Sequence, residues 1–178
     1  MGRLLYLIVL MFLGVFIACG PNWRKPKTNY NPPPSIKAWV CIGVPDAQFE
    51  AVEKSVTEWN RSIGVWKHLI PVREKFSPGC SYWIHEVKLP ANHEPTVLAW
   101  TNEIGGYEIS LIKGRYEFDT LGIMMHELGH AFGAQHVPGT LMNATWNRHY
   151  FTCPDLATVS QIAAWNHISL DLLTWCSQ

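Results

Sequence analysis

The stretch from His126 to His136 constrains the fold more than any other part of the chain. It reads HELGHAFGAQH, with histidines at positions 126, 130 and 136. On an α-helix, residues four apart lie about 40° apart around the axis and one turn along it, so His126 and His130 project from the same side. Glycine accepts a positive φ, and Gly133 stands where the helix must end for His136 to return to the same point. The chain therefore needs a helix that presents two imidazoles and then turns back sharply.

Three neutral imidazoles with an open fourth position form the ligand set of a catalytic zinc ion, whereas structural zinc normally has four protein ligands. Such an ion makes hydroxide available at neutral pH. Glu127 lies next to the first histidine and about 100° around the helix, where its carboxylate can accept the proton of a water without binding the metal. The sequence therefore predicts one zinc held by His126, His130 and His136, with Glu127 as the catalytic base of a hydrolase.

Hydrophobic periodicity predicts an α+β fold in a definite order of elements. Alternating apolar residues indicate strands, and apolar residues three and four apart indicate helices. In the active-site helix, a separate apolar stripe would face the core, formed by Leu121, Met125, Leu128 and Phe132. Asp119 or Thr120 could cap that helix. The expected order is a strand at 36–42, a helix from 46 to Gly64, strands at 69–72, 82–87, 96–100 and 107–112, a helix from 119 or 120 to about 132, and a last helix from 154–155 through 162.

The segment from His126 to His136 matches every specified position of H-E-x-x-H-x-x-G-x-x-H, the signature of the metzincin metallopeptidases. Gly139-Thr140-Leu141-Met142 resembles the turn of that family in which a methionine lies beneath the metal. Gly129 and Leu141-Met142 are most similar to the matrixins and their bacterial relatives. The resemblance implies a zincin fold with a twisted, mostly parallel sheet and one antiparallel edge strand, two long helices and a C-terminal helix.

The resemblance also implies an activity, a zinc-dependent endopeptidase acting on peptide or protein substrates. Substrate-binding residues are unknown, although the resemblance places the substrate along the sheet edge near residues 96–100. Asp155 has two interpretations, a helix N-terminal charge or a carboxylate that supports the Met142 turn. Because Asn143-Ala144 stands where matrixins have Tyr-Pro, the subfamily stays open. His85 and His93 lack the aspartates of a second metal site and are expected at the surface or the core edge.

The N-terminus predicts export. Arg3 precedes an apolar run over residues 4–18, which has the length of a signal-peptide core and is short for a bilayer span. Residues 16–20 resemble the lipobox of bacterial lipoproteins, in which Cys19 is lipidated. The expected organisation is a signal peptide at 1–18, the lipidated cysteine and a flexible, proline-rich tether at 19–34, and a catalytic domain at 35–178. The alternative is a secreted protein in which Cys19 carries no lipid.

Cysteine number agrees with an oxidising compartment. If Cys19 carries lipid, four cysteines remain, an even set that favours two disulfides. Pairing Cys41 with Cys80 and Cys153 with Cys176 is favoured, because each bridge then stays within one half of the chain. The fragment that begins at Cys41 also resembles the cysteine switch of matrixins, but an isoleucine interrupts that motif and its arginine is missing, so we expect Cys41 to lie in a strand and to be bridged to another cysteine.

Size and charge limit the number of domains and the kinds of partner. The 178 residues can form one domain with a core, and fourteen basic residues balance fourteen acidic ones, which does not favour a nucleic-acid partner. We expect a monomer at the bacterial cell envelope, held to the membrane by its lipid. Two alternatives to the endopeptidase stay open, a non-catalytic envelope lipoprotein that uses the fold for binding, and a zinc amidase acting on cell-wall peptides.

Overall fold

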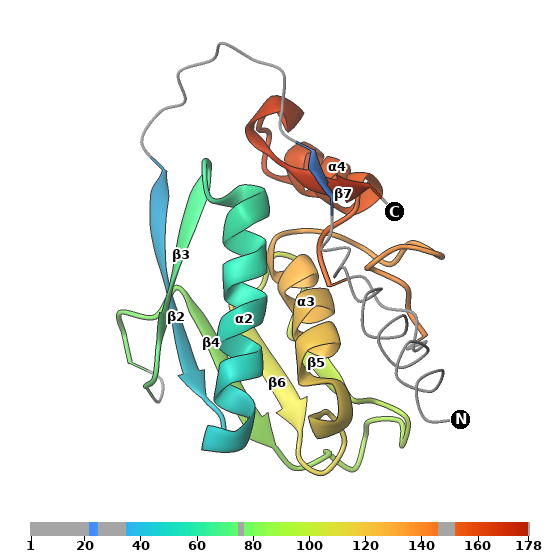
Figure 1. Ribbon diagram of the computed structural model, residues 1–178. Coiled ribbons are helices and arrows are strands. Elements are labelled where there is room, and N and C mark those ends of the chain that lie inside the picture. The colour runs from blue at the N-terminus through green and yellow to red at the C-terminus, as the bar shows by residue number, and fades with distance from the viewer. Residues whose placement is uncertain (1–21, 25–34, 75–76, 146–151, 178) are drawn as a thin grey trace, which may run out of the picture.

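A five-stranded mixed sheet forms the centre of the fold (Figure 1). Its strands lie in the order β3-β2-β4-β6-β5, of which β5 alone is antiparallel to its neighbour, at one edge. This is the α+β class with the antiparallel edge strand that the resemblance implied, so the predicted fold class is confirmed. The strands are β2 (Ile36–Gly43), β3 (Lys67–Val72), β4 (Tyr82–Val87), β5 (Ala99–Thr101) and β6 (Glu108–Ile112).

The computed structural model describes residues 22–24, 35–74, 77–145 and 152–177. The expected signal peptide (1–18), the expected lipidation site Cys19 and most of the expected tether lie outside the described residues. Within that tether segment, however, β1 (Asn22–Arg24) pairs antiparallel with β7 (Trp175–Ser177) near the C-terminus. In the described part of the chain, no helix combines the length and apolar character needed to cross a membrane.

Two helices lie side by side over one face of the sheet, α2 (Asp46–Ile63) and α3 (Thr120–Ala131) (Figure 1). Fully buried apolar side chains of α2 recur at positions 52, 56, 59 and 63, the spacing of one helical face. Trp59 joins the two helices, because its indole Nε1 donates to the carbonyl of Met125 at 3.1 Å and its ring packs edge-on against Phe132. Both helices were predicted within one or two residues at their ends.

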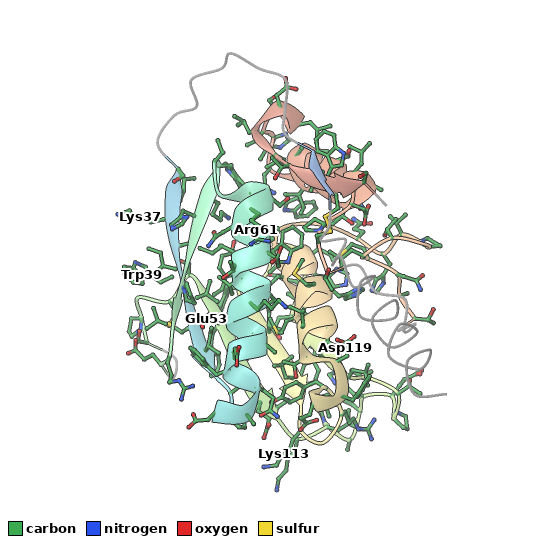
Figure 2. The ribbon with its side chains drawn as sticks, viewed as in Figure 1. Lys37, Trp39, Glu53, Arg61, Lys113 and Asp119 are labelled. Carbon is green, nitrogen blue, oxygen red and sulfur yellow. A yellow bond between two sulfur atoms is a disulfide. The ribbon has the colours of Figure 1, made fainter. Side chains whose placement is uncertain are left out.

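The start of α3 is fixed by a side-chain cap. A short 3-10 helix, η1 (Glu117–Asp119), precedes it, and the carboxylate of Asp119 accepts a hydrogen bond from the backbone of Gly122 at 3.0 Å. Figure 2 shows Asp119 beside this end of the helix. Of the two candidate caps, the structure therefore uses Asp119, which satisfies one of the free N–H groups at the helix start. Thr120 instead becomes the first residue of the helix.

The C-terminal part consists of α4 (Leu156–Trp165), a short 3-10 helix η2 (Leu170–Leu172) and β7. The expected start of α4 at Pro154-Asp155 was too early. Asp155 has an extended backbone, and its carboxylate caps the helix by accepting from the backbone of Thr158 at 3.0 Å. The helix therefore begins one residue later, and Pro154 lies before its cap. Strand β7 and its partner β1 were not predicted.

Two disulfides are present among the described residues, and their pairing is the one favoured from the sequence. Cys41 of β2 is bonded to Cys80, which lies just before β4. Cys153, ahead of α4, is bonded to Cys176 of β7. The second disulfide anchors the C-terminal strand beside the cap of α4, where Asp155 and Cys176 also form an isolated β-bridge.

The two faces of the sheet differ in how deeply their side chains are buried. On the side of the helices, the apolar core contains buried residues of every strand but β5, among them Val40, Ile84 and Ile109. On the opposite side, Lys37 and Trp39 of β2 point away from the helices, as Figure 2 shows, and Trp39 is 47% exposed. Alternation of side chains along each strand accounts for this division.

Candidate metal centre

Three imidazoles meet beside α3. His126 and His130 project from the same side of that helix, and His136 reaches them from the loop that follows it. Their Nε2 atoms form a nearly equilateral triangle, 3.1 Å from His126 to His130, 3.1 Å from His130 to His136 and 3.3 Å from His126 to His136. The return of the chain depends on Gly133, whose φ of +101° is open to glycine and strained for other residues.

Hydrogen bonds orient two of these rings. Nδ1 of His126 donates to the carbonyl of Leu141 at 3.0 Å, and Nδ1 of His130 donates to the carbonyl of Ala134 at 2.8 Å. A carbonyl can only accept, so each Nδ1 carries the proton and each Nε2 is left with a free lone pair. This is the tautomer in which a histidine binds a metal through Nε2.

The three side chains fit a tetrahedral zinc ion. Zinc–nitrogen bonds of about 2.0–2.1 Å place two ligand nitrogens about 3.3–3.4 Å apart, close to the edges of the observed triangle. Lone pairs gathered this closely repel one another unless a cation lies between them. Among the described residues, no fourth histidine, cysteine or acidic side chain joins the group. The donor set is therefore the open, three-histidine type that catalytic zinc uses.

Burial keeps the first two imidazoles neutral. It lowers the pKa of His126 to about 4, an effect that the hydrogen bond to Leu141 opposes and the neighbouring His136 reinforces. The pKa of His130 is also lowered, chiefly by burial. Because metals bind the neutral ring, both residues are in the ligand form at neutral pH.

Glu127 lies beside this triangle, on the next face of α3. Its side chain is buried, and burial raises the pKa of the carboxyl above its ordinary value. The hydroxyl of Thr101 in β5 lies 2.9 Å from Oε2 of Glu127 and 3.0 Å from its backbone carbonyl. Sequence reasoning selected Glu127 but missed Thr101, because 26 residues separate the two and no local pattern links them.

Met142 packs against α3 at Gly129. It is fully buried, and a Cβ added to Gly129 would lie 2.4 Å from its Sδ atom. Glycine at position 129 therefore lets the methionine approach the backbone of α3 between the two histidines. A hydrogen bond closes the turn that carries Met142: the backbone N–H of Val137 donates to the carbonyl of Met142 at 2.8 Å. Residues 137–142 therefore form a closed turn that packs its methionine against α3.

Asp155 fulfils both interpretations that the sequence left open. One oxygen, Oδ1, caps α4, and the other, Oδ2, accepts from the backbone of Leu141 at 2.8 Å. Leu141 in turn holds the ring of His126 through its carbonyl. The buried carboxylate therefore links the C-terminal helix to the orientation of a metal-site histidine.

The triangle opens into a cleft of about 860 Å³. One wall is the edge strand β5 with the segment before it, and the other is α3 with the residues after Met142. Apart from the imidazoles, the ionisable side chains along it are Glu103 and Glu127. The lining residues are Thr96, Val97, Leu98, Ala99, Trp100, Thr101, Glu103, Ile104, Gly122, Ile123, His126, Glu127, His130, Gln135, His136, Leu141, Asn143 and Ala144.

His85, His93 and Cys41 lie away from the triangle of imidazoles. Nε2 of His85 is 2.9 Å from a carboxylate oxygen of Glu108, and the ring of His85 stacks on Trp83. His93 packs edge-on against Trp100 and is half-buried. Both histidines are at the edge of the core, as expected. Cys41 is bonded to Cys80, so its sulfur is not free to act as a cysteine switch.

Comparisons with known solved structures give distant likenesses. No family model matches the sequence, and no curated protein matches it. One similar solved structure is high choriolytic enzyme 1, a hatching-enzyme zinc-protease from Oryzias latipes (medaka fish), at 20% identity and a TM-score of 0.37. That match covers 65% of this chain and 50% of the fish protein. Another is a chaperone–substrate complex, at 12% identity and a TM-score of 0.44, covering 78% of this chain and 39% of that one.

Proposed function

We propose that this chain is a zinc-dependent endopeptidase of the metzincin type, similar to the matrixins and their bacterial relatives. The observation that carries the proposal is the triangle of Nε2 atoms beside the buried carboxylate of Glu127, at the floor of an open cleft. His126, His130 and His136 would hold one zinc ion. The three imidazoles and the adjacent acid agree with the motif in the sequence, and the methionine that packs against Gly129 agrees with the turn that the resemblance implies.

The residues around the triangle have separate roles in peptide hydrolysis. When bound, zinc supplies a Lewis acid that polarises a carbonyl and lowers the pKa of water from about 15.7 to about 7. Glu127 accepts the proton of the attacking water and delivers it to the leaving amine. The raised pKa of its carboxyl suits both steps, because a group that takes and returns a proton works best with a pKa near the operating pH. Leu141 and Ala134 keep two imidazoles in the binding tautomer.

The free edge of β5 beside the triangle supports cleavage within a chain rather than at its end. Strand β5 pairs with β6 on one side only, and its residues line the cleft. An extended peptide can add to such an edge as a further strand, held by its backbone. The substrate would then pass across the triangle with residues on both sides of the cleaved bond.

The experiment that tests the proposal is a cleavage profile of a peptide library with purified protein. We expect internal bonds of long peptides to be cut, activity to disappear with a zinc chelator and to return when zinc is added. Metal analysis should give one zinc per chain. A sample that takes up no zinc, or that cuts no peptide when loaded with it, would contradict the proposal.

The same purified protein distinguishes the endopeptidase from the two alternative functions, a zinc amidase and a non-catalytic lipoprotein. Release of stem peptides from purified peptidoglycan, without cleavage of ordinary peptides, would instead identify a zinc amidase. A loaded protein without either activity would favour the envelope lipoprotein that only binds its partner.

We further propose that the protein is exported and held at a bacterial membrane through lipid on Cys19. The support is the sequence of residues 1–20, which lies outside the described residues, together with two disulfides that require an oxidising compartment. Cys19→Ser should move the protein from the membrane fraction to the soluble fraction, as measured by fractionation and immunoblotting. An unchanged membrane fraction would point to an uncleaved apolar anchor instead.

A further inference from the structure

Thr101 lies at the end of the edge strand with its side chain directed toward α3. In the antiparallel pair, Thr101 is opposite Ile109, which is fully buried under the helices. Directly paired residues share one face of a sheet, so Thr101 also faces the helices, whereas Trp100 faces the other way. Strand β5 runs beside α3, and this brings the hydroxyl of Thr101 to the acid of the proposed active site (Figure 1).

The hydroxyl has two acceptors within reach and one hydrogen to donate. Oε2 of Glu127 lies at 2.9 Å and the backbone carbonyl of the same residue at 3.0 Å. A hydrogen bond to a charged carboxylate is about twice as strong as one between neutral groups, so the ionised side chain takes the hydrogen. Among the described residues, Thr101 is the side-chain donor that this carboxylate has.

We propose that Thr101 is a positioning residue, whose hydroxyl holds one oxygen of Glu127 and so directs the other toward the water that attacks the substrate. The last torsion of a glutamate side chain has a broad, roughly two-fold profile and defines no single orientation. A donor on Oε2 removes that freedom and leaves Oε1 in a defined place. This role rests on the proposed function, because it concerns the base of that reaction.

Isosteric variants test the role. Thr101→Val keeps the shape of the side chain and removes the hydroxyl, so we expect kcat to fall about 10- to 100-fold, the size of effect that a misplaced reacting group produces. KM should stay within about twofold, because the hydroxyl acts on the base rather than on substrate binding. Thr101→Ser retains the hydroxyl and should restore kcat to within about threefold of the wild type.

Two further measurements separate positioning from general damage. Zinc affinity, measured by competition with a chromophoric chelator, should be unchanged in Thr101→Val, since the hydroxyl contacts none of the three imidazoles. Thr57→Val is the matched control: it removes the hydroxyl that donates to the carbonyl of Glu53 on the exposed side of α2, and should leave kcat unchanged. If Thr101→Val does not fold, Thr101→Ala replaces it with the same expected fall in kcat.

The outcomes distinguish this inference from the proposed function. An active wild type together with a folded Thr101→Val or Thr101→Ala variant at full kcat would overturn the role of Thr101 and leave the peptidase intact. A serine variant as poor as the valine variant would also overturn it. A wild type that binds zinc and cuts no peptide would overturn both.

Discussion

Glu127→Gln is expected to lower kcat for peptide cleavage by about 10²- to 10⁴-fold, the range that a general acid–base group contributes. The amide has nearly the shape of the carboxylate and can still accept from the hydroxyl of Thr101, but it cannot take up a proton at neutral pH. Zinc content should stay at one per chain, since His126, His130 and His136 are unchanged. Steady-state hydrolysis of a fluorogenic peptide and metal analysis of the same sample measure both quantities.

Glu53→Gln provides the control for this variant. Glu53 lies on the exposed side of α2, as Figure 2 shows, so its amide form should cleave the peptide at the wild-type rate. A Glu127→Gln protein that binds zinc and retains full activity would remove Glu127 from the mechanism. Loss of zinc together with activity would show instead that Glu127 supports the metal centre and would leave its role as a base without support.

Trp59→Ala is expected to lower the free energy of unfolding by about 3–5 kcal/mol, the usual cost of truncating a buried aromatic side chain to alanine. Trp59 is fully buried between α2 and α3, packs on Phe132 and donates to the carbonyl of Met125. Since domains are stable by about 5–15 kcal/mol, this is a large share of the total. Urea unfolding of the metal-free protein measures it without the added stability of bound zinc.

Trp39→Ala is the matched control, because Trp39 is 47% exposed on the face of the sheet away from the helices. Trp39→Ala should lower the free energy of unfolding by less than about 1 kcal/mol. We also expect weaker zinc binding in Trp59→Ala, since the lost ring packs against the helix that carries His126 and His130. Equal costs for the two tryptophans would contradict the assignment of Trp59 as the contact that joins the helices.

Most of the secondary structure could be predicted because it follows from local spacing. Residues four apart lie on one side of any α-helix, so His126 and His130 had to share a face once the helix formed. Likewise, a glycine at 133 can adopt the positive φ that reverses the chain toward His136. These statements depend on backbone geometry alone and needed no knowledge of the remaining fold.

Errors and omissions occurred where a segment depends on a distant partner. The strands β1 and β7 are three residues each, too short to show a period in the sequence, and they form because the chain brings them together. Helix α4 begins one residue later than expected, because Asp155 caps it instead of joining it. The choice between Asp119 and Thr120 as the cap of α3 was decided by which side chain could reach a free N–H group.

The sequence by itself determined which side chains could hold a metal and which acid stood next to them, because His126, Glu127 and His130 are neighbours along one helix and His136 follows shortly after its end. The tertiary structure alone decided what surrounds them. Sheet order placed Thr101 at the carboxylate of Glu127, and the position of α4 let Asp155 hold the turn that orients His126. Such contacts join residues far apart in the chain, so they arise only when sheet pairing and core packing fix the distances between whole elements.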